Sequence, residues 1–261
     1  MTKLLKRTLF NFLGLDGYLS LLQKTYLLSY KAGFLKNNPI YAWHYFVKKL
    51  VREDDTVVDI GANLGYFASV FLEKLSSSGH LYCVEPVEPY RKQLRKITDG
   101  KKNVTLFSFA LGNENKESIH LGMPAAFSDL GYLRHGLVTV ETDERAIAQN
   151  ITFNSSLKKA SEVFAPFTKI DYIKCDIEGY ETVVIPEMKD ALLKHKPLVQ
   201  LETWHDNLAF MINFFKEIGF EPFNLVNGKL VSCYTLPMDQ INGSDVLFVP
   251  KEKRERIERF L

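Results

Sequence analysis

The chain has 261 residues, of which 46% are hydrophobic and 25% are charged, a composition typical of a globular protein with one large α/β domain. Its formal net charge of +2 is too small to indicate a partner by itself. The three cysteines are far apart and argue against a disulfide framework or a zinc motif, and no apolar run approaches the roughly 18 residues of a membrane span.

Residues 1–53 are predicted to form a helical extension, because leucines and tyrosines recur at helical spacing between Gly14, Gly33 and Pro39. The first fifty residues carry eight basic side chains and one acidic side chain, Asp16. A basic amphipathic segment can lie on an anionic membrane, whereas a helical cap or lid explains the same mixture of Leu and Lys. We expect the cap or lid in a cytoplasmic protein, with peripheral membrane contact as the alternative.

Residues 54–250 are predicted to form the main domain, in which strands and helices alternate. Such alternation favours a parallel sheet with helices on both faces. The expected strands are 56–60, 80–84, 104–109, 170–175 and 198–201, and the expected helices are 66–75, a segment around 90–97, 181–195 and 206–218.

The remaining segments are less regular. Residues 113–150 are expected to form a loop-rich insertion with one or two short strands, followed by a short extended piece at 151–157. Residues 220–226 and 229–234 flank Asn227-Gly228, which predicts a hairpin with a type I′ turn. A last strand at 246–249 precedes a charged C-terminal tail, 251–261, which is expected to be helical.

The stretch from Val57 to Phe67 joins a buried strand to a helix through a glycine turn. Gly61 and Gly65 let backbone approach a ligand without an intervening Cβ. Asp59 precedes the turn and is a poor partner for a phosphate, since both are anions. The turn lacks the Gly-Lys-Ser/Thr of a phosphate-binding loop and the full G-x-G-x-x-G of a dinucleotide fold, so it favours a ligand with a cation or hydroxyls.

Acidic side chains end four of the predicted strands, which places them at one edge of the sheet. Helix caps and first turns also attract Asp and Glu, and this explains some of them. Glu85 is less easily explained as a cap, because Glu is a poor capping residue and Pro86 follows it. An acid at the end of the second strand can accept both hydroxyls of a ribose. The four strand ends carry Asp59, Glu85, Asp176 with Glu178, and Glu202.

Six segments of the chain form a recognisable set: Asp59-Ile-Gly-Ala-Asn-Leu-Gly-Tyr-Phe, Val84-Glu85-Pro86, Asn103-Val104, Ala110-Leu111-Gly112, Ile173-Lys-Cys-Asp-Ile-Glu-Gly-Tyr-Glu181, and Glu202 with His205. Together they resemble the FkbM family of S-adenosylmethionine-dependent methyltransferases. The resemblance implies a Rossmann-like class I fold with a seven-stranded, mostly parallel sheet whose last strand is antiparallel. It also implies O-methyl transfer, often to sugar or polyketide hydroxyls.

The resemblance also implies roles for individual residues. Gly61, Asn63, Gly65 and Tyr66 shape the methionine pocket, and Asp59 lies near the methionine amine. Glu85 and Pro86 hold the ribose, Ala110 and Leu111 border the adenine, and Asp176 lies beside the sulfonium. One departure is that Ser156-Leu157-Lys158 stands where the family has Thr-Leu-Asp, which removes an acid.

Methyl transfer to an alcohol needs the acceptor to lose a proton, so a general base is expected. His205 is the first candidate because its reference pKa is near neutral, with Asp176, Glu178 and Glu202 as alternatives. Asp176, Glu178 and Glu202 could instead hold a divalent ion. Glu178, His135 and Trp204 are candidate acceptor contacts, although a His or Trp of this kind is also common as an ordinary surface or packing residue.

The sequence therefore predicts an O-methyltransferase that uses S-adenosylmethionine and acts on a small-molecule or glycan acceptor. The alternative is a non-catalytic or nucleic-acid-binding protein on the same fold. No nucleic acid is expected as partner, because the basic N-terminal segment lacks an interleaved aromatic platform at the sheet edge. No motif identifies the acceptor.

Overall fold

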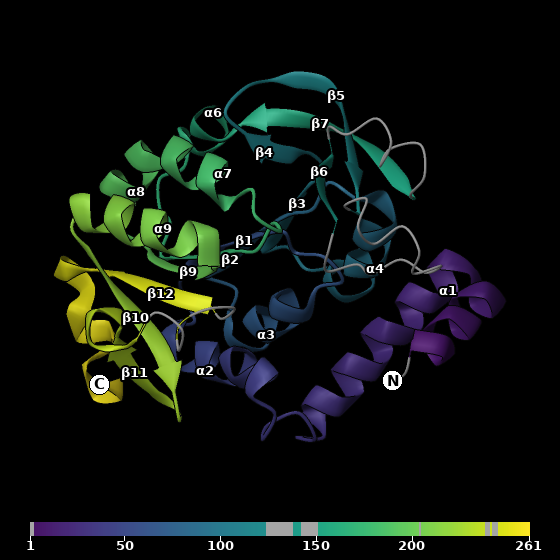
Figure 1. The fold of residues 1–261 in the computed structure, drawn as a ribbon, viewed down its shortest axis with the longest axis horizontal. Helices are drawn as coiled ribbons and strands as arrows, with labels where there is room; N and C mark the ends of the chain where they lie inside the picture. The colour runs from purple at the N-terminus through teal and green to yellow at the C-terminus, as the bar shows by residue number, and fades with distance from the viewer. Residues whose placement is uncertain (1–2, 124–137, 142–150, 204, 238–240, 242–244) are drawn as a thin grey trace.

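A computed structural model describes residues 3–123, 138–141, 151–203, 205–237, 241 and 245–261. Its centre is an eight-stranded sheet in the order β11-β10-β12-β9-β8-β1-β2-β3, with helices on both faces (Figure 1). The strands are β1 Thr56–Ile60, β2 His80–Val84, β3 Val104–Phe107, β8 Tyr172–Cys175, β9 Leu198–Glu202, β10 Phe220–Val226, β11 Lys229–Ser232 and β12 Asp245–Pro250.

The sheet is parallel from β3 to β9 and antiparallel at its other edge. Strand β12, the last in the chain, runs antiparallel to both β9 and β10, as expected for a Rossmann-like class I fold. The hairpin predicted around Asn227-Gly228 is present, and its second strand, β11, adds an eighth strand to the seven that the family resemblance implies.

The strand order reverses between β1 and β8, which are neighbours in the sheet but far apart in the chain. Their register pairs Asp59 with Lys174 and Ile60 with Cys175. In an open α/β sheet, ligands bind outside the carboxyl ends of the strands at such a reversal. The fold therefore brings the glycine turn and the Asp176 segment to one place.

Helices cover the two faces of the sheet, each burying an apolar side (Figure 1). Helices α2 Ala42–Leu50 and α3 Tyr66–Lys74 pack on one face, and α7 Glu181–Glu187, α8 Lys189–His195 and α9 His205–Glu217 pack on the other. The other described helices of the domain are α4 Glu88–Thr98 and α6 Ala160–Phe164. The prediction of one helix over 181–195 is wrong, because the chain breaks at Met188, directly after a turn containing Pro186, which has no backbone N–H to donate.

A second, four-stranded sheet in the order β4-β7-β5-β6 was not predicted from the sequence. The expected strand 104–109 ends at Phe107, and Ala110–Gly112 forms β4 of the second sheet instead. The expected loop-rich insertion and extended piece supply β5 Lys116–Gly122, β6 Thr139–Glu141 and β7 Thr152–Lys159. These strands are rich in polar residues and half-exposed, so they lack the apolar run that identifies a buried strand.

The N-terminal extension is helical and is fixed to the domain at the glycine turn. Helix α1, Lys3–Lys31, kinks at Gly14, which has φ 65° and ψ 178°, and the 3₁₀ turn η1 Pro39–Tyr41 leads into α2. The buried Gln23 side chain donates to the carbonyl oxygens of Leu64 and Gln93, each at 2.8 Å. Within the described residues, no helix is both long and apolar enough to cross a membrane.

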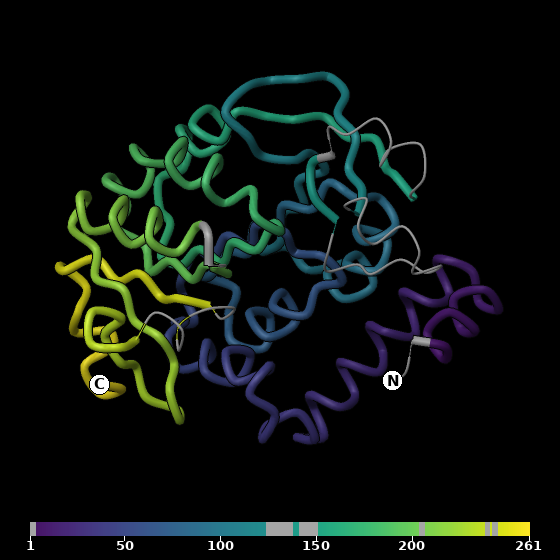
Figure 2. Tube along the Cα trace, in the orientation of Figure 1, coloured from purple at the N-terminus to yellow at the C-terminus, as the bar shows by residue number. Residues whose placement is uncertain are grey.

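The C-terminal tail is helical as predicted, but it forms two short 3₁₀ helices, η5 Lys251–Arg256 and η6 Glu258–Phe260, and no α-helix. Another 3₁₀ helix, η4 Cys233–Thr235, follows β11. The tail is held by inward contacts, because Ile257 is fully buried and Arg256 Nη2 donates to Asp55 Oδ2 at 2.6 Å and to the Leu50 carbonyl oxygen at 2.7 Å. In Figure 2 the tail lies at the opposite end of the molecule from the start of α1.

We expect Arg256→Ala to lower the free energy of unfolding by about 3 kcal/mol, because it leaves the carboxylate of Asp55 buried without its counter-charge. The matched control is Arg254→Ala, which breaks an exposed ion pair with Glu221 and should cost less than about 1 kcal/mol. Urea unfolding of both variants measures the two free-energy changes. Equal changes would show that the buried ion pair contributes no more to stability than the exposed one.

Candidate active site

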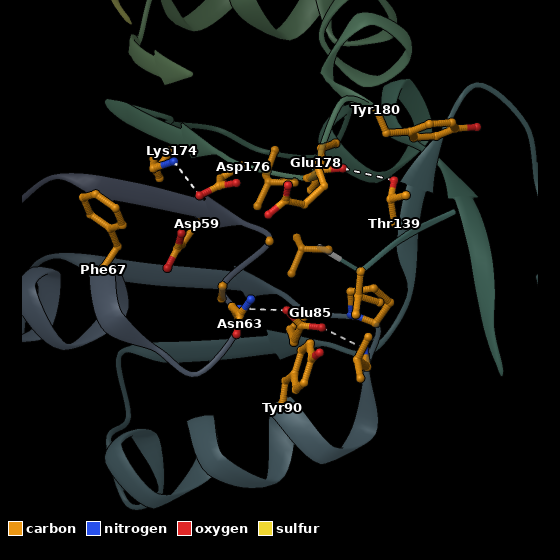
Figure 3. Close-up of a pocket in the computed structure, with 18 of the residues that line it drawn as sticks. Asp59, Asn63, Phe67, Glu85, Tyr90, Thr139, Lys174, Asp176, Glu178 and Tyr180 are labelled. Carbon is orange, nitrogen blue, oxygen red and sulfur yellow. Dashed lines mark hydrogen bonds and ion pairs between the residues drawn. The ribbon is translucent and has the colours of Figure 1, made fainter. Parts of the chain in front are cut away.

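A cavity of about 280 Å³ lies at the carboxyl ends of β1, β2 and β8. Its size is near the lower end of the range for small-molecule sites. Its walls come from the glycine turn, the ends of β2 and β8, and the second sheet (Figure 3). Ile40 and Tyr41, before α2, also line it. Ten residues singled out from the sequence line it: Asp59, Gly61, Asn63, Tyr66, Glu85, Pro86, Ala110, Leu111, Asp176 and Glu178.

Asp59 presents a buried carboxyl group to the cavity. The residue is 2% exposed, and its Oδ2 has no hydrogen-bond partner among the described residues. Burial raises the pKa of Asp59 to about 7, and the opposing attraction of Lys174 does not offset it. A cationic or hydrogen-bond-donating ligand would supply the partner that this oxygen lacks.

Glu85 is held in place by backbone N–H groups on both of its oxygens. Oε2 accepts from Asn63 at 2.7 Å and Oε1 accepts from Val87 at 2.8 Å (Figure 3). Burial raises the pKa of Glu85 to about 7 although these two hydrogen bonds favour the charged form. Each oxygen keeps a second lone pair, so the oriented carboxylate can still accept from two ligand hydroxyls.

The two glycines of the turn have different functions. A side chain at Gly61, where φ is 78°, would overlap the carbonyl oxygen of Asp176, so glycine lets the ends of β1 and β8 meet. Gly65, predicted to shape the cofactor pocket, instead packs against α4, where a Cβ would come within 2.8 Å of Leu94 Cδ1. Its effect on the cavity is indirect, through the position of α4.

Lys174 is a buried cation at the centre of the site that was not predicted from the sequence. Its side chain is 1% exposed, and Nζ lies 3.3 Å from Asp176 Oδ2 and 3.4 Å from Asp245 Oδ1. Burial alone would lower its pKa, but Asp176 and Asp245 outweigh burial and raise it above the ordinary value. A lysine inside the apolar run Tyr172–Cys175 was the available signal, because buried lysines are rare unless paired.

Asp176, Glu178 and Glu202 form a cluster in which one oxygen from each lies within 4.8 Å of the others. Burial would raise the pKa of Asp176, but the ammonium of Lys174 lowers it below the ordinary value. Burial and the charge of Asp176 raise the pKa of Glu202 well above its ordinary value. At neutral pH the hydrogen-bonded pair therefore shares one proton, with Asp176 as its more acidic member.

The turn that carries Asp176 and Glu178 is stabilised by a hydrogen bond to Glu181. Glu178 adopts a left-handed φ of 56°, unusual for a side-chain-bearing residue, and Gly179 follows at φ 96°. Glu181 is fully buried and its Oε1 accepts from the Ile177 N–H at 2.7 Å. The three acids of the Asp-x-Glu-Gly-x-Glu segment therefore have different positions. Asp176 and Glu178 line the cavity, and Glu181 stabilises the turn.

The N-terminal segment contributes Tyr41 and His44 to the cavity wall, and neither was predicted from the sequence. The ring of His44 stacks on Phe67, with centroids 4.1 Å apart and planes at 20°. Its Nδ1 is buried and has no hydrogen-bond partner among the described residues. Burial, followed by the charge of Lys174, lowers the pKa of His44 to about 3, so the ring is neutral at physiological pH.

The other predicted site residues are only partly described. Glu202 joins the acidic cluster without lining the cavity. His135 and Trp204 lie outside the described residues, and for His205 the structure describes only the backbone, at the start of α9. Their predicted roles stay predictions.

The sequence matches the profile of a family described as Methyltransferase FkbM domain, over residues 59–222. This region contains the glycine turn, Glu85 and the Asp176 cluster. No curated protein matches the sequence.

Three solved structures with a similar fold are distant in sequence. A methyltransferase FkbM from Methylobacillus flagellatus KT has 16% identity and a TM-score of 0.51 over 80% of this chain and 47% of that chain, so the present chain spans about half its length. An O-methyltransferase from Thermotoga maritima has 14% identity and a TM-score of 0.43 over 78% and 63% of the two chains. A putative rRNA methylase from Clostridium thermocellum has 11% identity and a TM-score of 0.47 over 81% and 94%.

We expect Asp59→Asn to stabilise the ligand-free protein by about 2 kcal/mol at pH 8, and by less at pH 5. The folded pKa of Asp59 is raised to about 7, so ionisation costs stability as pH rises from about 4 to about 7. The amide carries no such cost. Urea unfolding at both pH values measures the effect, with the exposed Asp54→Asn as control; a gain that does not grow with pH would contradict the assignment.

Proposed function

The chain belongs to the FkbM methyltransferase family, and we propose that it transfers the methyl group of S-adenosylmethionine to a hydroxyl of a sugar, glycan or other small acceptor. The observation that carries the proposal is the pair of buried acids, Asp59 and Glu85, at neighbouring strand ends on one cavity. Their chemistry fits a ligand with an amine and a diol.

The amine of the donor fits the Asp59 side of the cavity. Oδ2 of Asp59 lacks a hydrogen-bond partner among the described residues, while Lys174 makes its ion pairs with Asp176 and Asp245. A bound ammonium group would pair with Asp59 and favour its ionised form. Gly61 and Asn63 bring backbone to the same side of the cavity.

The ribose and the base of the donor fit the other side. Glu85 faces the cavity with an orientation fixed by two backbone N–H groups, so it can accept from both ribose hydroxyls without losing further side-chain entropy. Ala110 and Leu111 supply apolar walls beyond it, which suit an adenine ring. This arrangement supports S-adenosylmethionine over a dinucleotide, which would place a pyrophosphate near Asp59.

S-Adenosylmethionine supplies a methyl group on a sulfonium, which is already activated for in-line displacement. The residues of the chain then position the acceptor and exclude water. Asp176 lines the cavity and is kept ionised by Lys174, so its negative charge favours a cationic sulfur nearby. Glu178 lines the same wall and is our candidate for an acceptor contact.

The acceptor hydroxyl must lose its proton during transfer. Glu202 is a poor base, because its raised pKa keeps it protonated at neutral pH. His205 remains our candidate base, at the start of α9 directly after the β9 end of the sheet. His44 is a second candidate, since its neutral ring lines the cavity with an unpartnered nitrogen among the described residues, but its low pKa makes it the weaker base.

An acceptor of small size is supported by the concave shape of the site. Twenty-six described residues line the cavity from several elements, and the second sheet covers one side through Leu121, Thr139 and Val140. A nucleic acid acceptor would need an open basic groove leading to the cavity. The cations nearest the donor side, such as Lys174, are buried in ion pairs instead.

We expect Asp59→Asn and Glu85→Gln each to weaken S-adenosylmethionine binding by about 10- to 100-fold, because each removes a charge-assisted contact. Calorimetric titration of the purified chain measures the affinity. The control is Glu53→Gln, whose side chain is 70% exposed and distant from the cavity lining, and its affinity should equal that of the unsubstituted chain. No binding to the unsubstituted chain, or equal affinity in all variants, would overturn the proposal.

We further expect the acidic cluster to bind no divalent ion. Lys174 already provides Asp176 with a positive charge at 3.3 Å, and Glu202 holds a proton that a metal would have to displace. Titration with Mg²⁺ and Mn²⁺, followed by calorimetry and by thermal unfolding, should show no saturable binding. Saturable binding that disappears in Glu202→Gln would establish a metal site and contradict this assignment.

A further inference from the structure

Exposed apolar side chains are concentrated at the N-terminal end of the described chain. Eight of the fourteen large hydrophobic residues that are exposed in the described part occur before residue 42. Several are almost fully exposed, including Phe12 at 85%, Phe34 at 83% and Leu4 at 75%. Single exposed leucines are ordinary, but a concentration of this kind in a short segment indicates an interaction surface.

The exposed residues follow the helical repeat of α1 on either side of its kink at Gly14. In the first half Leu4, Leu5 and Phe12 share one side of the helix. In the second half Leu21 and Leu28 recur at a spacing of seven, while Tyr18, Gln23 and Tyr26 on the opposite side are buried against the domain. One side of the second half of α1 therefore packs on the domain, and the apolar residues lie on the other, exposed side.

Basic side chains occur among these apolar residues, and four of them have no acidic partner in the described part of the chain. Arg7, Lys24, Lys31 and Lys36 are exposed, and none forms an ion pair with a described residue. Lys24 and Lys31 lie on the same side of the helix as Leu21 and Leu28. Asp16, the one acidic residue of the first fifty, is neutralised by an ion pair with Lys92.

We propose that this surface docks on an anionic lipid bilayer, with the apolar side chains entering the interface and the basic ones contacting headgroups. We define it as the N-terminal face: the apolar Leu4, Leu5, Phe12, Leu28, Phe34 and Ile40 with the basic Arg7, Lys24, Lys31 and Lys36. Leucine and phenylalanine interspersed with exposed lysine and arginine match both parts of such an interface. A protein partner with an acidic groove would match only the charges.

The N-terminal face also reaches the rim of the cavity. Ile40 is 78% exposed and at the same time lines the cavity next to Tyr41. The second half of α1 is rigidly attached to the glycine turn through Gln23, and Tyr26 stacks on the cavity-lining Tyr66 with centroids 4.0 Å apart. Docking of this face therefore holds the cavity close to the bilayer surface.

The test is co-sedimentation of the full chain with vesicles of phosphatidylcholine and phosphatidylglycerol, compared with vesicles of phosphatidylcholine alone. We expect binding to the anionic vesicles that is released by high salt. Each of Arg7→Gln, Lys24→Gln, Lys31→Gln and Lys36→Gln should lower partitioning about fivefold, and Phe12→Ser or Phe34→Ser about tenfold. Matched controls are Phe210→Ser and Lys101→Gln, exposed residues outside this face, which should bind as the unsubstituted chain does.

Three results would overturn the proposal. The first is that the chain does not bind anionic vesicles. The second is that sedimentation velocity shows the chain to self-associate and Phe12→Ser to make it monomeric, and the third is that single-stranded RNA displaces the chain from the vesicles. Calorimetric titration with S-adenosylmethionine on the same variants, which all lie outside the donor side of the cavity, separates this test from that of the proposed function. If the chain binds vesicles but not S-adenosylmethionine, the docking proposal stands and the proposed function is overturned.

Discussion

The buried ammonium of Lys174 is the interaction that sets the chemistry of the site. It lies at the reversal of strand order, in register with Asp59 and within ion-pair distance of Asp176 and Asp245. One cation shared among several buried acids cannot keep all of them ionised. Asp176, which is paired with it, stays charged, whereas Glu202 keeps a proton and Asp59 has a pKa near neutral.

This arrangement costs stability in the ligand-free protein and prepares it for a cationic ligand. Asp59 and Glu85 are both almost fully buried, and burial raises the pKa of each to about 7. Such acids would be unfavourable in a purely structural position. They become favourable when a ligand brings a cation and hydroxyl donors, so the binding energy for the donor is linked to their ionisation.

Much of the fold and of the cavity lining could be predicted from the sequence, because some residues form patterns that can be read locally. The glycine turn, the strand-end acids and the order of buried strands are local patterns, and they identified ten residues that line the cavity. The second sheet was missed because β5 and β7 are polar and half-exposed and therefore lack the apolar run that identifies a buried strand. Lys174 was missed although a lysine inside the apolar run Tyr172–Cys175 was a local signal, whereas His44 was missed because only tertiary contacts bring it to the cavity. The contact of Gly65 with α4 also depends on the folded arrangement.

The most direct measurement is proton release on binding S-adenosylhomocysteine, obtained by calorimetry at pH 6.5 in buffers of different ionisation enthalpy. With two acids of pKa about 7 becoming ionised, the account predicts release of about one to two protons per ligand, and roughly half as many in either Asp59→Asn or Glu85→Gln. Binding without proton release, or release that neither substitution changes, would contradict the assignment of these two acids as the donor's anchors.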